Sequence, residues 1–187
     1  MEISSALNNQ LLIAMPGMAD PNFNATVTLI CEHNEEGALG IIINRPLNLQ
    51  LGGLFEQISI SSNDQQLIER PVLHGGPVAQ NRGFVLHSAE FTFDSSVAVS
   101  AEIQLTLSRD ILDAIARGDG PEKNVVALGY AGWDAGQLEA EILANSWLNV
   151  AATPEIVFDV PYADRWQVAT RLLGIDVSQL SPDAGHA

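Results

Sequence analysis

Alternating apolar and polar positions mark the clearest pair of strands in the chain. Residues 26–33 alternate with a period of two, which places Cys31 and His33 on the same face as neighbouring apolar side chains. Residues 34–37 supply turn formers and end in a glycine, and the apolar run 39–43 follows. The pattern predicts a β-hairpin whose second strand is central, because its isoleucines leave neither face polar.

The same reasoning predicts five further strands and four helices. The strands cover residues 11–15, 72–74, 83–87, 103–107 and 125–130. The helices carry apolar stripes within residues 51–58, after Ser108 up to Gly118, after Asp134, and after Asp164 up to Gly174. Asp134 and Asp164 each precede by three residues a glutamine that can reach back, as in a capping box. Asn145, Ser146 and Trp147 then lead into another strand.

Strand-like and helix-like segments mix along the whole chain, without a repeat or a linker. This mixture predicts one α+β or α/β domain over residues 1–187, with residues 181–187 as a mobile tail. With 187 residues, the length also suits a single domain.

Charge changes the picture of possible partners. The chain holds 23 acidic and 8 basic residues, a formal net charge of −15, and the acids are spread throughout. Such a surface repels polyanions, so we expect no direct binding to nucleic acid. A single cysteine fits a reducing compartment, and we find neither a signal peptide nor an apolar run long enough to span a bilayer. We therefore expect a cytoplasmic protein without a membrane association.

Motifs with an established mechanism are missing from the sequence. It has no phosphate-binding loop, dinucleotide fingerprint, zinc-binding helix or nucleophile elbow, so we predict no cofactor, no metal site and no catalytic residue. Cys31 and His33 could form a thiolate and base, but Cys31 continues an apolar face, where a thiol acts as a small hydrophobe. Glu32, His33, Glu35 and Glu36 could gather a cation at the hairpin tip, although acids in a turn are usually only solvated.

Two arginines beside chain reversals form the candidate ligand site. His74 is followed by Gly75 and Gly76, whose backbone amides lack side-chain cover, and by a proline that stiffens the turn. Arg82 leads into the strand that ends at His87, and Arg45 ends the central strand in a similar Asn-Arg pattern. Together they could prepare one anion-binding corner. Alternatively, the arginines pair with nearby carboxylates and the glycines only serve turns.

Trp133 is a further candidate, at a strand-to-helix junction. Such junctions often bind ligands, and the indole could form an aromatic wall. The alternative is that Trp133 is a packing residue and Asp134 only a helix cap.

Many separate motifs resemble the bacterial AlgH/YqgE family, and the similarity covers nearly the whole chain. In chain order they are Ala14-Met15-Pro16, Asp20-Pro21-x-Phe23, Glu32-His33-Asn34-x-x-Gly37-Ala38-x-Gly40, Asn44-Arg45-Pro46, Gly75-Gly76-Pro77-Val78, Arg82-Gly83-Phe84-Val85-Leu86-His87, Leu128 to Trp133, Gln137-Leu138-Glu139-x-Glu141 and Asn145-Ser146-Trp147-Leu148. Cys31 and His74 do not belong to the pattern.

This resemblance implies an α+β fold of one domain, with a mixed, bifurcated sheet that curls into a pseudo-barrel and is flanked by helices. It implies less about function, because the family is largely uncharacterised and its name reflects a regulatory connection to alginate synthesis. It supplies no catalytic or metal-binding residue. Direct action as a transcription factor also conflicts with the acidic charge.

Two functional hypotheses follow. The first is a non-enzymatic regulatory or adaptor protein that acts through a protein partner or a small anionic effector, with Arg45, Gly75, Gly76, Arg82 and His87 as the ligand corner. The second is an enzyme acting on a small anionic metabolite in that region, with His87 or Glu139 as base and an arginine holding the substrate.

Overall fold

The computed structural model describes residues 6–174, in which strands and helices alternate irregularly. The strands are β1 (Gln10–Ala14), β2 (Val27–Asn34), β3 (Gly37–Ile42), β4 (Pro46–Gln50), β5 (Pro71–His74), β6 (Val78–Ser88), β7 (Val97–Ala98), β8 (Ile103–Thr106), β9 (Asn124–Asp134) and β10 (Trp147–Ala151). The helices are α1 (Leu51–Gln57), α2 (Gln65–Ile68), α3 (Arg109–Arg117), α4 (Gln137–Leu143) and α5 (Arg165–Leu172), with a π-helical turn, η1 (Glu155–Asp159), and a 3₁₀ turn, η2 (Tyr162–Asp164).

One branched sheet connects all the strands. Its main path runs β10-β1-β2-β3-β9-β6-β8-β7, and every neighbouring pair on that path is antiparallel. Strand β9 is the branch point, because its first half pairs with β6 and, in parallel, with β5, whereas its second half pairs with β3. The sheet is strongly curled, so the predicted α+β class with a mixed, bifurcated, barrel-like sheet is confirmed.

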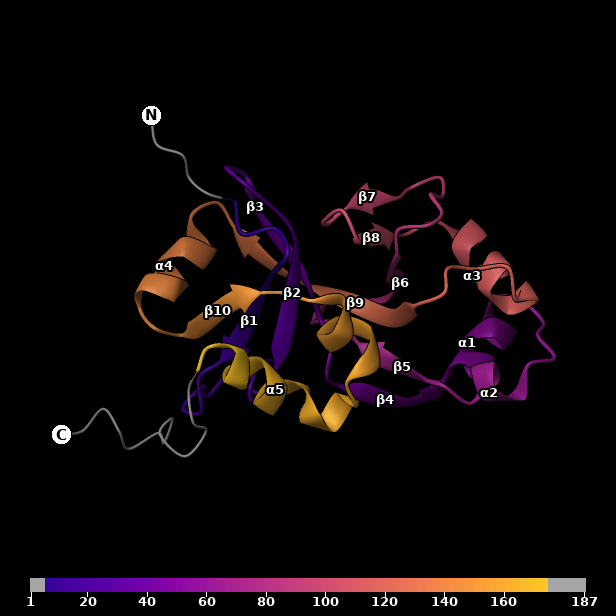
Figure 1. Ribbon diagram of the computed structural model, residues 1–187, viewed down its shortest axis with the longest axis horizontal. Helices are drawn as coiled ribbons and strands as arrows, with labels where there is room; N and C mark the ends of the chain where they lie inside the picture. The colour runs from indigo at the N-terminus through magenta and orange to yellow at the C-terminus, as the bar shows by residue number, and fades with distance from the viewer. Residues whose placement is uncertain (1–5, 175–187) are drawn as a thin grey trace.

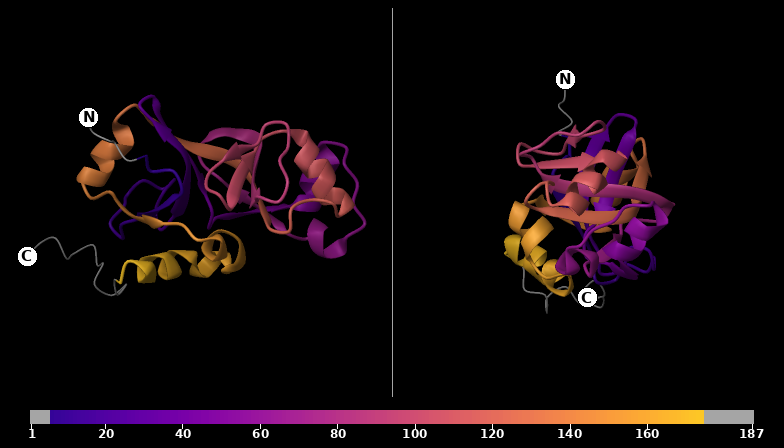
Figure 2. Two further views of the ribbon diagram at one scale, coloured as in Figure 1. Left: turned by 45° about the horizontal axis from the view of Figure 1, so that its top comes forward. Right: turned by 90° about the vertical axis from the view of Figure 1, so that its right-hand side faces the viewer.

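Helices cover the curled sheet at three places (Figures 1 and 2). Helix α5 and turn η1 pack on a central cluster that includes Leu29, Ile41 and Phe84. Helices α1 and α3 cover a second cluster against β5, β6 and β9, at one end of the long axis. Helix α4 covers a third cluster, around Trp133 and Trp147, at the opposite end. Burial of these apolar faces supplies the main drive for folding.

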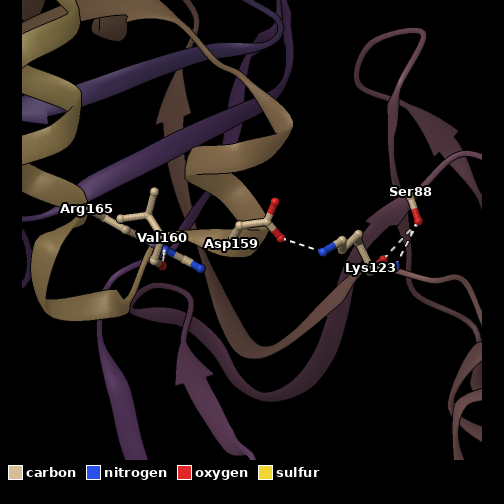
Figure 3. Close-up of polar contacts among 5 residues, drawn as sticks. All are labelled: Ser88, Lys123, Asp159, Val160 and Arg165. Atoms are coloured by element: carbon tan, nitrogen blue, oxygen red, sulfur yellow. Dashed lines mark hydrogen bonds and ion pairs between the residues drawn. The ribbon is translucent and has the colours of Figure 1, made fainter.

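Polar contacts fasten the C-terminal segment across the sheet. The Lys123 Nζ atom lies 2.7 Å from Oδ1 of Asp159, and this ion pair joins the start of β9 to η1 (Figure 3). Arg165 donates from Nε to the Val160 carbonyl at 2.8 Å, also drawn in Figure 3. The Trp166 indole donates to the Ala14 carbonyl, on β1, at 3.0 Å. Segments far apart in sequence are therefore held together at defined points.

Most elements with local signals form as expected. The β2–β3 hairpin is confirmed, with Glu35 and Glu36 as its two loop residues. The predicted reach of Gln137 back to Asp134 is confirmed, because the Asp134 N–H donates to Gln137 Oε1 at 2.9 Å. The N-cap itself lies two residues later than predicted, since Asp134 ends β9 and Gly136 precedes the first residue of α4. The tail expected at residues 181–187 lies outside the described residues.

Candidate functional site

Arg45 lies just after β3, and its guanidinium donates hydrogen bonds to backbone carbonyls. Nη1 donates to the carbonyls of Pro21 and Asn22 at 2.9 and 2.8 Å, and Nη2 donates to the carbonyl of Asn24 at 2.7 Å. These bonds hold the loop between β1 and β2. Among residues 6–174, Arg45 therefore pairs with no carboxylate, and both of its terminal nitrogens already donate to carbonyls instead of being available to an anion.

Gly75 and Gly76 allow two stretches of backbone to cross. The chain passes from β5 on one edge of β9 to β6 on the other edge, and the connection runs over β9. A Cβ at Gly75 would collide with the Gly129 carbonyl, and a Cβ at Gly76 with the Tyr130 carbonyl. The Gly75 amide donates to the Leu128 carbonyl at 2.8 Å, so it is not free to bind an anion.

Arg82 and His87 lie on the same strand, β6, in opposite surroundings. Arg82 is exposed and follows Val78 after an irregularity in strand register, and its side chain forms no hydrogen bond or ion pair with any residue of the range 6–174. His87 is fully buried, and its Nε2 lies 2.7 Å from Thr106 Oγ1. Its Nδ1 lies 2.9 Å from the Ser88 carbonyl and must donate to it, so Nε2 accepts from the Thr106 hydroxyl in the neutral ring.

Burial lowers the pKa of His87, although the Ser88 carbonyl and Glu90 oppose the shift. Burial likewise lowers the pKa of His74, with the nearby Arg45 guanidinium as the second cause. The His74 amide donates to the Arg45 carbonyl at 2.7 Å, so the Arg45 and Gly75 backbones do lie close together.

Trp133 belongs to a buried aromatic cluster under α4. Its indole N–H donates to Oε1 of Glu141 at 3.0 Å, and the Trp147 indole donates to the same oxygen at 3.0 Å. Phe23 packs edge-on against Trp147, with ring centroids 5.4 Å apart. One carboxylate thus satisfies two buried indoles and ties α4 to β9 and β10, an arrangement that stabilises this end of the fold.

The six predicted site residues do not gather around one cavity. Arg45 and Gly75 are close through their backbones and Gly76 lies at the crossing, whereas the His87 ring is enclosed beside Thr106 and the Trp133 indole beside Glu141. Of the six, Trp133 lines a depression of the described surface that the other five do not line.

That depression, which we call the acidic groove, lies on the face of β2, β3 and β9 opposite α4. It has a volume of about 490 Å³ and is lined by Glu32, Asn34, Glu36, Gly37, Ala38, Leu39, Val78, Tyr130, Gly132, Trp133 and Asp134. The sheet register explains the grouping. Glu32, Leu39 and Gly132 are successive cross-strand partners, as are Asn34, Gly37 and Asp134, and directly opposed residues point to the same face.

Two features keep this face open. Gly37 and Gly132 have no side chain to fill the hollow. In addition, β3 pairs with the second half of β9 and β6 mainly with its first half, so the sheet divides beside the groove. On the opposite face, His33 and Trp133 point toward α4, and Nε2 of His33 lies 2.9 Å from Oε2 of Glu139.

The side chains invoked for the enzyme hypothesis are engaged elsewhere. His87 is enclosed, Glu139 pairs with His33, and neither lines the acidic groove. Burial, with a smaller effect of Glu32, raises the pKa of the Cys31 thiol, which opposes thiolate formation. Within residues 6–174, no group of three or more histidine, cysteine or acidic side chains is arranged to hold a metal ion. No helix in that range has the length and apolar character needed to cross a membrane.

Arg165 is a buried arginine that the sequence analysis did not predict. It is 1% exposed, its Nη1 donates to the Ile43 carbonyl at 2.6 Å, and its guanidinium lies 4.6 Å from the centroid of the Tyr162 ring. Burial lowers its pKa to about 10, although Tyr162 and Asp159 oppose the shift. Sequence reasoning missed it, because its partner at Ile43 lies 122 positions away and no local pattern indicates that contact.

Comparison with known proteins agrees with the fold and with the earlier resemblance. A family model described as AlgH-like matches residues 11–178. A UPF0301 protein of Thioalkalivibrio sulfidiphilus is 55% identical over 187 residues, which cover 100% of both chains. A UPF0301 protein of Ralstonia nicotianae is 54% identical over 181 residues, covering 97% of this chain and 95% of that one.

Two solved structures share the architecture. The solution structure of the AlgH protein from Pseudomonas aeruginosa has a TM-score of 0.81 at 45% identity and covers 100% of this chain and 99% of its own. A crystal structure of a Corynebacterium diphtheriae protein has a TM-score of 0.75 at 20% identity, covering 97% and 94%, which supports the fold alone. The branched sheet, the matched family model and these relatives agree that the chain belongs to the AlgH-like family.

Proposed function

We propose that this protein is a non-enzymatic cytoplasmic regulator or adaptor that binds a protein partner in the acidic groove. The observation that carries the proposal is the groove itself, an open hollow of about 490 Å³ lined by residues of β2, β3 and β9. Small-molecule sites of similar volume are usually enclosed and mostly apolar. An open face with a polar lining is better suited to a segment of another protein.

The charge of the chain favours this class of partner over nucleic acid. With a formal net charge of −15, the surface repels phosphate backbones. A small anionic effector would depend on Arg82, the exposed arginine of the predicted corner, because Arg45 is held by carbonyls. The acidic groove offers such an anion no cationic side chain.

Site-specific photocrosslinking in the native cell tests the proposal. A photoreactive residue replaces Val78, which is 39% exposed in the groove, and in a matched variant it replaces Val97, which is 44% exposed on β7 outside it. We expect one protein to form an adduct through position 78 and not through position 97. Identical adducts at both positions, or none at position 78, would contradict the use of the groove.

A further inference from the structure

We infer that the segment entering the acidic groove is an extended peptide rich in lysine and arginine, contributed by the protein partner. This inference rests on the proposed function and adds the chemistry of the partner. Its first support is charge: Glu32, Glu36 and Asp134 line the groove, and no lysine, arginine or histidine does.

The three carboxylates have no cation of their own. Glu32, Glu36 and Asp134 are all exposed, and none of their side chains forms an ion pair or hydrogen bond with a residue of the described part of the chain. Elsewhere in that part, Asp113, Asp119 and Asp159 each meet a basic side chain within 4 Å. The groove is thus a site of uncompensated negative charge, which a basic partner would neutralise.

The groove also offers apolar surface between the acids. Leu39 and Tyr130 are partly buried in its floor, and Val78 is 39% exposed at its side. Lysine and arginine bring long aliphatic stems that cover apolar surface while their charged ends reach a carboxylate. The Tyr130 ring can also attract a cation through its π face. A side chain that combines a stem with a cationic end matches both features.

The spacing of two cross-strand rows in the groove suits an extended chain. Glu32 and Asp134 belong to two cross-strand rows that lie two residues apart along the strands. That separation is roughly 7 Å, the distance between side chains i and i+2 of an extended peptide. A peptide running along the strands can therefore place every second side chain beside a row. A compact metal ion fits less well, since no group of three ligating side chains converges in the described residues.

Fluorescence anisotropy with a defined probe tests this inference. The probe is a fluorescein-labelled octapeptide that alternates glycine with lysine and arginine, and the control peptide has glutamate at the basic positions. The groove variant combines Glu32→Gln, Glu36→Gln and Asp134→Asn. The matched variant removes the same charge from exposed acids outside the groove, through Glu56→Gln, Glu102→Gln and Glu155→Gln.

We expect the wild-type and matched proteins to bind the basic probe and the groove variant to bind it about tenfold or more weakly. An exposed ion pair contributes up to about fivefold, so three pairs account for that loss. Raising salt should weaken binding in the same direction. Amide shifts in an NMR titration should cluster on β2, β3 and β9.

Several results would overturn the inference. For the peptides, these are an equal loss of affinity for the basic probe in the two triple variants, or a glutamate peptide that binds as tightly as the basic one. In the NMR titration, the contradicting result is amide shifts away from the groove. Spermine that binds in the groove as tightly as the peptide, or self-association that the groove variant abolishes, would point to a different occupant. If the position-78 adduct persists while the basic probe fails, only the chemistry of the partner is wrong. If that adduct is also absent, the proposed function fails with it.

Discussion

The backbone crossing at Gly129 allows a sharp test with an internal control. Gly129 and Gly118 both have φ of 83°, a left-handed conformation that costs alanine roughly 1–2 kcal/mol. Their surroundings differ. A Cβ at Gly118 meets nothing within 4 Å, whereas a Cβ at Gly129 would collide with the Gly76 carbonyl. The two alanine variants therefore share the cost of the same positive φ and differ in the collision.

The expected magnitudes follow from that difference. Alanine also restricts the unfolded chain, which offsets about 0.4–1 kcal/mol at either position. Gly118→Ala should therefore lower the free energy of unfolding by about 1 kcal/mol. Gly129→Ala carries an additional overpacking cost of roughly 1–3 kcal/mol, because the obstructing atom is backbone and cannot rotate away.

Urea unfolding followed by tryptophan fluorescence measures both variants. Since the urea dependence of small proteins is about 1–3 kcal/mol per molar, the extra cost should lower the midpoint for Gly129→Ala by about 1 M relative to Gly118→Ala. Equal midpoints for the two variants would refute the crossing as the reason for glycine at position 129. A loss larger for Gly118→Ala would refute it as well.

Three further predictions concern buried polar groups. Arg165→Met should lower the free energy of unfolding by about 3 kcal/mol, because two carbonyls lose their donor. The control Arg171→Met, on the exposed side of α5, should lower it by less than about 1 kcal/mol. Similar urea midpoints for the two variants would contradict this prediction. Glu141→Ala should lower the free energy of unfolding by about 2–4 kcal/mol, because two buried indole N–H groups lose their acceptor. An unchanged near-ultraviolet circular dichroism spectrum and an unchanged melting temperature would count against it. Burial lowers the pKa of His87 in the folded protein, so as pH falls the unfolded chain binds a proton at this position first. The free energy of unfolding therefore decreases from about pH 6.5 down to the folded pKa, by at most about 1.4 kcal/mol per pH unit. His87→Gln should flatten that dependence in urea unfolding between pH 7 and 5, and an unaltered slope would exclude His87 as the cause.

Elements defined by neighbouring residues could be predicted from the sequence. The β2–β3 hairpin needs only period-two alternation and a turn, and α3 needs only an apolar stripe that ends at Gly118, which does take up a left-handed conformation. Short elements were missed because they have weak local signals. Strand β4 begins with a proline, and β7 has only two residues, so tertiary pairing rather than propensity establishes them.

The site was harder to predict because its contacts are distant in sequence. Arg45 looked available for an anion because its acceptors are carbonyls more than 20 positions earlier, which no motif identifies. The groove was partly visible in the sequence. Alternation places Glu32 and Asn34 on the polar side of a strand, but the alignment of Asp134 with them depends on the register of β3 with β9.

Three of the seven arginines bond to neutral acceptors and leave the acidic surplus of the chain uncompensated. Arg45, Arg70 and Arg165 donate to backbone carbonyls and, for Arg70, to the Asn124 side chain, so they hold distant segments together without neutralising a carboxylate. The three acids of the groove likewise have no ion-pair partner among residues 6–174. A field of this sign accelerates encounter with a basic partner and weakens as salt screens it. The association rate should therefore fall with salt in every variant, whereas the dissociation rate should rise mainly when the groove carboxylates are removed, since the acids of the matched variant lie outside the groove.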